Sequence, residues 1–153
     1  MKIAILSPPE IPVPVKDYGG IELVAYNLYS EIKRRGYSAD IYGSGEAIPY
    51  SNGIGEYDRY FDFTHMKVDQ LWNKEGYYST VMLTDRPHPK FNIYPSYAVK
   101  EAFRIDGKVI YPGIRNVYKE GESRGYLLFL GRIHPIKGVH IAIIVSKMAG
   151  KDL

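Results

Sequence analysis

Hydrophobic and polar positions alternate along the chain in a pattern that predicts strands and helices in turn. An apolar run at residues 2–7 ends at a proline pair, which is typical of a buried strand entering a loop. Over residues 21–35 the apolar positions recur at helical spacing, basic residues fill the last turn, and Gly36 follows. A second apolar run at residues 37–42 predicts another strand. The first third of the chain is therefore a βαβ unit.

The rest of the pattern continues this alternation. Further strands are predicted at residues 60–64, 80–84, 91–94 and 108–111, with helical turns at 66–72 and a helix from its N-cap Ser96 through Phe103. This order predicts an α/β protein with a Rossmann-like open parallel sheet, whose ligands bind at the carboxyl ends of the strands. Residues 1–113 form this domain, 114–125 are a linker, and 126–153 add a further strand, turn and helix.

Length and charge narrow the classes of function. A chain of 153 residues holds one full α/β domain and is too short for two. The formal net charge of +3 is mild and the basic residues are scattered, which argues against a nucleic-acid partner. There is no cysteine, so disulfides and thiolate zinc sites are excluded. The short apolar start is not a secretory or membrane-spanning segment, and we expect a cytoplasmic protein without a membrane span.

The chain contains 15 tyrosines but only five phenylalanines and one tryptophan. Tyrosine rings supply buried area in a core, and they also stack on sugars in binding sites. The sequence leaves both uses open.

Two glycines immediately precede the long predicted helix, in SPPEIPVPVKDYGGIE. Backbone amides at a helix N-terminus, with no side chain in the way, are suited to approach a phosphate, so Gly19 and Gly20 are candidate phosphate-binding residues. A tight turn into a helix also favours glycine. The segment lacks the GxGxxG fingerprint, and Asp40 lies within the second strand rather than after it, which disfavours a nicotinamide-dependent oxidoreductase.

The stretch LLFLGRIHPIKG carries the second candidate phosphate site. Its apolar run leads to Gly131 and Arg132, and Lys137 stands at the start of the next predicted helix. Cations at a helix N-terminus oppose the helix dipole unless an anion lies between them. Because Arg offers a planar fork and Lys a point charge, the two side chains are suited to clamp a diphosphate.

Four segments together resemble one known family: MKIAILSPP, YGGIE, VIYPGI and YLLFLGRIHPIKGVHIAI. They are similar to the retaining, nucleotide-sugar-dependent glycosyltransferases of family four, which have the GT-B fold. The resemblance implies two Rossmann-like domains across a cleft, the first shaping the acceptor site and the second binding the donor. Arg132 and Lys137 would hold the donor diphosphate, and Gly19 and Gly20 would approach it from the other side. The donor is a substrate, and no separate cofactor is implied.

The resemblance also indicates catalytic candidates. The family commonly has a histidine lining the acceptor cleft after the strand TVMLT, where this chain has Asp85 followed by His88. His65 ends another predicted strand, FDFTH, at a place where the family often has histidine. A lone histidine is also commonly a structural residue. No histidines and carboxylates show metal-ligand spacing, so no metal is expected.

The family's paired glutamates seven residues apart, which contact the donor sugar and ribose, are absent. We therefore expect an acceptor-side domain plus the first βα unit of a donor-binding domain, with little or no transfer activity alone. The alternative is a non-catalytic module that binds nucleotides or sugar phosphates, or an acceptor-side subunit that needs a partner chain. An apolar C-terminal unit, residues 127–129 and 141–145, also predicts a homodimer or a missing domain that covers it.

Overall fold

The structure is a computed structural model that describes residues 1–64, 68–80, 88, 91–113 and 121–153. The chain divides into two compact units, Met1–Arg115 (unit 1) and Asn116–Leu153 (unit 2). In the described residues no helix is long and apolar enough to cross a membrane.

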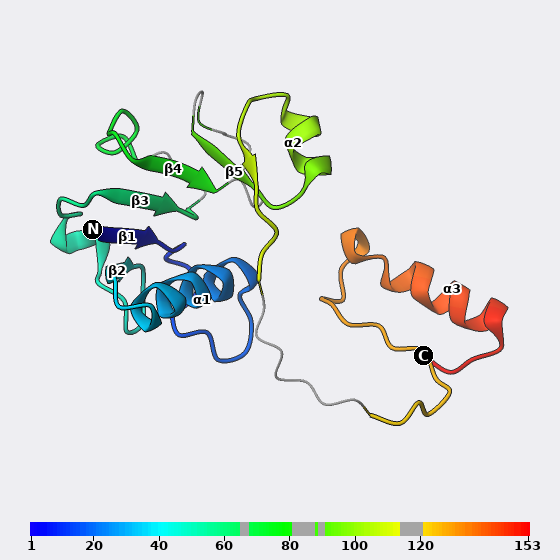
Figure 1. Ribbon diagram of the computed structural model, residues 1–153. Helices are drawn as coiled ribbons and strands as arrows, with labels where there is room; N and C mark the ends of the chain where they lie inside the picture. The colour runs from blue at the N-terminus through cyan, green and yellow to red at the C-terminus, as the bar shows by residue number, and fades with distance from the viewer. Residues whose placement is uncertain (65–67, 81–87, 89–90, 114–120) are drawn as a thin grey trace. The chain divides into compact units, whose positions relative to one another are not determined.

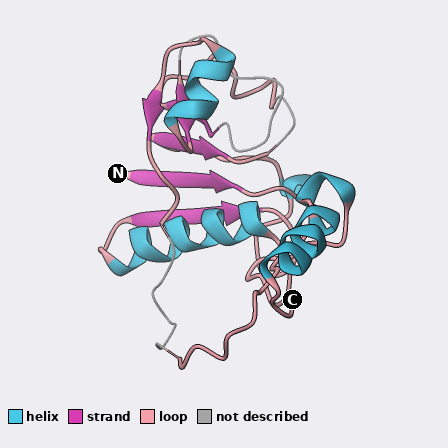
Figure 2. Cartoon of the chain, turned by 90° about the vertical axis from the view of Figure 1, so that its right-hand side faces the viewer, coloured by secondary structure: helices cyan, strands magenta, loops and turns pink. Residues whose placement is uncertain are grey.

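Unit 1 is built on a six-stranded sheet in the order β2-β1-β3-β4-β5-β6, and every neighbouring pair is parallel. Figure 1 shows the chain coloured along its length, and Figure 2 shows neighbouring strands with α1 lying along them. The elements of unit 1 are β1 (Lys2–Leu6), α1 (Gly20–Arg34), β2 (Ser38–Tyr42), the 3-10 helix η1 (Tyr50–Asn52), β3 (Arg59–Asp62), β4 (Tyr77–Thr80), β5 (Asn92–Tyr94), α2 (Tyr97–Phe103) and β6 (Lys108–Val109). The predicted α/β class with an open parallel sheet is confirmed.

The two helices of unit 1 cover opposite faces of this sheet. From β1 through α1 to β2 the chain moves one way across the sheet, and from β5 through α2 to β6 it moves the other way. Right-handed crossovers in opposite directions place their helices on opposite faces. Accordingly Ile5 belongs to the core cluster under α1, whereas the Tyr94 ring stacks on Phe103 of α2, with ring centroids 6.3 Å apart.

Tyrosines form much of the core on the face opposite α1. Tyr42, Tyr60 and Tyr77 are buried there with Ala4 and Leu6. The phenol groups keep hydrogen bonds, such as the one joining the hydroxyls of Tyr42 and Tyr57 at 2.9 Å. Each ring fills volume in the core, and its hydroxyl can hydrogen-bond to nearby polar groups. These tyrosines therefore serve packing.

Most predicted elements lie within two residues of their observed bounds, and the Ser96 N-cap is confirmed, since its Oγ accepts from the Val99 N–H at 3.3 Å. The strand predicted at 80–84 begins earlier, because β4 is Tyr77–Thr80; residues 81–84 lie outside the described residues. In the predicted helical stretch, residues 69–72 form turns.

Unit 2 contains the 3-10 helix η2 (Pro135–Lys137) and α3 (Val139–Ala149). The strand predicted at residues 126–130 is wrong, because in the part of the chain that the structure describes these residues pair with no strand. The Leu127 N–H donates to the carbonyl of Asp152 at 2.7 Å. An apolar run becomes a strand only where a neighbouring strand supplies the ladder of hydrogen bonds.

Candidate functional site

The start of α1 is the predicted phosphate-binding position in unit 1. Gly19 is the N-cap with φ of 145°, a conformation that favours glycine, and no side chain caps the helix. A Cβ on Gly20 would meet nothing within 4 Å, so the backbone there is open to approach. The geometry fits an anion contact at the first amides of the helix.

A carboxylate already lies at this helix terminus. Glu22 is only 6% exposed, and a Cβ built on Gly19 would lie 2.9 Å from its Oε2. The negative charge of Glu22 interacts favourably with the positive end of the helix dipole. A phosphate at Gly19 and Gly20 would therefore share that end of the helix with a carboxylate.

The turn before α3 is the second predicted phosphate site. His134 is the N-cap of η2, and its Nδ1 accepts from the Ile136 N–H at 3.3 Å. Gly138 then adopts a left-handed conformation, with φ of 73° and ψ of 26°, and starts α3. The turn is closed, since a Cβ on Gly131 would lie 3.9 Å from the Cβ of Lys137. Arg132, next to Gly131, and Lys137 therefore belong to neighbouring parts of one turn.

This turn carries two cationic side chains, Arg132 and Lys137. The first turn of α3 has no acidic residue and no side-chain cap. Arg132 and Lys137 are both exposed. Uncapped amides, the positive end of an 11-residue helix and two cations together favour an anion. Of the two predicted phosphate sites, this turn has the more favourable charge for an anion, because it combines a helix N-terminus with two cations, whereas the start of α1 has a carboxylate beside it.

His88 is held inside unit 1 by its own chain. It is 5% exposed, and its Nδ1 accepts from the Phe91 N–H at 3.1 Å while its Nε2 lies 2.8 Å from the Trp72 carbonyl. Its backbone also exchanges two hydrogen bonds with the Asn92 side chain, at 2.7 and 2.6 Å. These contacts connect loops on either side of β4. A catalytic role for His88 stays a prediction, as it does for Asp85 and His65, which lie outside the described residues.

Sequence reasoning did not select Asp62, which ends β3 at the carboxyl edge of the sheet. This side chain is 2% exposed and accepts from the Tyr77 hydroxyl at 2.6 Å and from the Thr64 N–H at 2.8 Å. Burial, with the Asp62 charge as the next cause, raises the pKa of Tyr77 and also that of Tyr50. The aspartate within the aromatic run YFDFT was the available signal.

Beside Asp62 the carboxyl edge contains further buried polar groups. The Tyr50 hydroxyl donates to the carbonyl of Ser7 at 2.7 Å. Within the described ranges, the Ser7 hydroxyl is itself buried and has no hydrogen-bond partner. An unsatisfied buried hydroxyl is uncommon and is compatible with a contact to a ligand or a water molecule. No group of three or more His, Asp or Glu side chains in the described segments is placed to hold a metal ion.

Comparison with known proteins adds nothing to this geometry: no family model, no curated protein and no solved structure matches the chain.

Proposed function

We propose that this protein binds the diphosphate of a nucleotide sugar at the turn before α3 and takes part in retaining glycosyl transfer to an acceptor. The observation that carries the proposal is the concentration of positive charge at an uncapped helix start, with Arg132 and Lys137 on one closed turn. A diphosphate matches this arrangement because its several oxygens can accept hydrogen bonds both from the forked guanidinium group of Arg132 and from the ammonium group of Lys137.

The chemistry follows from where charge develops. When a nucleotide diphosphate leaves a sugar, negative charge grows on the oxygen that bridged them. Arg132 and Lys137 would stabilise that charge more strongly than they stabilise the intact donor, which is the requirement for lowering a barrier. The α3 amides would add fixed dipoles with the same sign of effect.

The proposal is tested by calorimetric titration of the full chain with UDP, GDP, ADP and their sugar conjugates. Arg132→Ala and Lys137→Ala are each expected to weaken binding roughly tenfold or more, since each removes a charge-assisted contact. Lys147→Ala is the matched control, because Lys147 stands in the last turn of the same helix. Equal losses in all three variants would show only non-specific attraction, and unchanged binding in Arg132→Ala and Lys137→Ala would overturn the proposal.

Retaining transfer is tested separately from binding. The chain is incubated with the donor that binds most tightly and with candidate acceptors, and release of the nucleotide diphosphate is followed. Product with the donor's anomeric configuration supports the reaction class. Tight binding without any release, across acceptors, would favour a module that binds nucleotide sugars without transferring them.

A further inference from the structure

The face of the sheet under α1 is only half covered. Phe61 and Tyr78 are register partners on this face, and their rings stack with centroids 5.5 Å apart. Phe91 continues the row, with its ring 6.3 Å from Tyr78. Among the described residues α1 covers β1 and β2 here, while α2 lies on the opposite face. Parallel sheets normally have both faces covered, whereas no described helix of unit 1 packs on β3 to β6 on this side.

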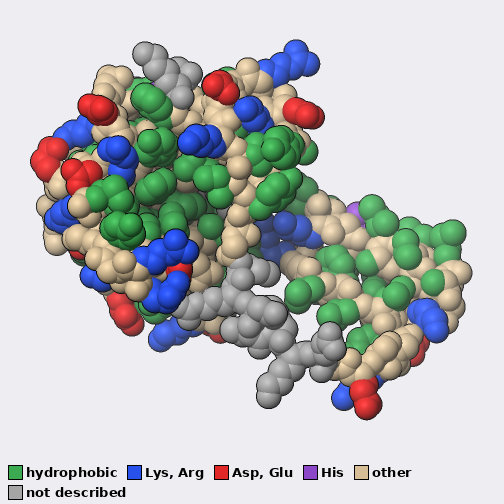
Figure 3. Space-filling view, in the orientation of Figure 1, with side chains coloured by type: hydrophobic (Ala, Val, Ile, Leu, Met, Phe, Trp, Pro, Cys, Tyr) green, Lys and Arg blue, Asp and Glu red, His purple; other side chains and the backbone are tan. Residues whose placement is uncertain are grey.

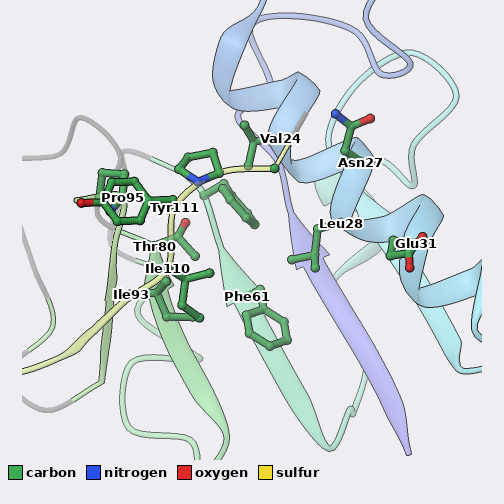
Figure 4. A pocket seen from close by; sticks show the side chains of 13 residues that line it. Val24, Asn27, Leu28, Glu31, Phe61, Thr80, Ile93, Pro95, Ile110 and Tyr111 are labelled. Atoms are coloured by element: carbon green, nitrogen blue, oxygen red, sulfur yellow. The ribbon is translucent and has the colours of Figure 1, made fainter. Parts of the chain in front are cut away.

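A groove of about 570 Å³ occupies this uncovered half-face. Figure 4 shows Leu28 and Val24 on the α1 side, Phe61 near the middle, and Ile93 and Ile110 on the other side. Figure 3 shows hydrophobic side chains gathered on the same face of unit 1. Because the lining is mostly apolar and beside a helix, the groove has the character of a site for a second helix.

Helix α3 in unit 2 carries an apolar stripe that the described residues of its own unit leave exposed. Ile141, Ile144, Val145 and Met148 follow the i, i+3, i+4, i+7 spacing of one helix face, and they are 56%, 56%, 50% and 84% exposed. Ser146, on another face of the helix, is buried and donates to the Lys151 carbonyl. The stripe is thus exposed while a different side of α3 is packed.

We propose that the groove of unit 1 binds the apolar stripe of α3 from a second copy of this chain, and that two copies exchange this contact reciprocally. The exposed stripe amounts to roughly 500 Å², so one such contact buries at most roughly 1,000 Å² on the two surfaces together, below the usual size of a stable interface. Two reciprocal contacts bury at most roughly 2,000 Å², which brings the interface into the usual range. The area therefore favours the symmetric exchange over a single contact.

The first test is the mass of the full chain in solution by sedimentation and light scattering. The expected result is a species of twice the monomer mass of 17.4 kDa. Two charge variants are expected to give monomers, Ile110→Glu in the groove and Ile144→Glu in the stripe. Both residues are more than half exposed, so neither change removes core packing. Controls are Tyr37→Glu in unit 1 and Lys147→Glu on another side of α3, which are expected to remain dimeric.

Mixing the two monomeric variants tests the exchange itself. Ile110→Glu keeps an intact α3 and Ile144→Glu keeps an intact groove, so an equimolar mixture can form one unmutated contact of the two. The mixture is therefore expected to associate more tightly than either variant alone and more weakly than the wild type. Circular dichroism of each variant checks that it is folded. A monomeric wild type, a dimer that survives either variant, or a folded mixture that associates no more than either variant alone would each overturn the proposal.

Discussion

Replacing His88 by alanine is expected to destabilise unit 1 strongly. The substitution leaves the Phe91 N–H and the Trp72 carbonyl without the ring that bonds both of them. It also removes ring contacts to Trp72 and Phe91, whose centroids lie 4.6 and 5.3 Å from that of His88. Only 5% of the residue is exposed, so water cannot readily replace these partners.

The magnitude follows from these contacts. Each unpaired backbone group costs about 1–1.5 kcal/mol at this partial burial, which gives about 2–3 kcal/mol for the two. Lost packing of the ring adds about 1 kcal/mol, so the expected decrease in the free energy of unfolding is about 3–4 kcal/mol. Domains have only about 5–15 kcal/mol in total, so the effect is a large fraction of the stability.

Urea denaturation followed by tyrosine and tryptophan fluorescence measures this difference. Tyr97→Ala is the control, because Tyr97 is 64% exposed at the start of α2, and a change within about 0.5 kcal/mol is expected for it. The slope of the transition should be the same in all three proteins. If His88→Ala were as stable as the control, the structural account of His88 would be refuted, and its predicted catalytic role would gain support.

Three further predictions concern the sheet and α1. Tyr77→Phe should lower the free energy of unfolding by about 2 kcal/mol, because it removes the hydrogen bond to Asp62. A double-mutant cycle with Asp62→Asn should show that the two effects are coupled, and additive effects would contradict the buried hydrogen bond. Gly76→Ala should lower the free energy of unfolding by more than about 2 kcal/mol, because φ is 79° and the new Cβ would lie 2.4 Å from a backbone oxygen. Gly36→Ala, at φ of 82° with open space around it, should lower it by only about 1 kcal/mol, and equal losses in urea denaturation would refute this. Hydrogen bonds from Arg34, at the end of α1, and from Arg35, which follows it, lower the pKa of Glu31 from 4.5 to about 2, so any stability that its charge contributes is present above pH 4.5 and lost as the pH falls toward 2. Acid titration of Glu31→Gln should lack this loss, and a pH profile identical to that of the wild type would contradict it.

The first βαβ unit could be predicted because every local signal in it agrees. Helical spacing, basic residues in the last turn and a following glycine all place the end of α1, observed at Arg34. The strand β4 was harder, because the sequence YYST looks polar beside the apolar TVMLT. Its tyrosine Tyr77 is buried by residues distant in the chain, and burial of a tyrosine cannot be read from its own neighbours.

In the candidate site, too, local features could be predicted from the sequence, whereas contacts between distant residues could not. The turn with Arg132 and Lys137 is local, and its closed shape with glycine at Gly138 follows from neighbouring residues. The contact between Asp62 and Tyr77 joins residues 15 positions apart on adjacent strands, so no sequence spacing announces it. The position of the Glu22 carboxylate beside Gly19 also depends on how the preceding loop returns to the helix. The local shape of a turn can therefore be predicted from the sequence, whereas contacts between residues distant in the chain cannot.

The most direct test of the proposed function is amide chemical-shift mapping of the full chain during titration with UDP, GDP and ADP. The account predicts that one diphosphate shifts the amides around Arg132, Lys137 and the start of α3. Smaller shifts are expected at Gly19 and Gly20, because the Glu22 carboxylate lies at that helix start. If no nucleotide moves the α3 amides, or if all three move surface amides equally, the turn is not a diphosphate site and the proposed function fails.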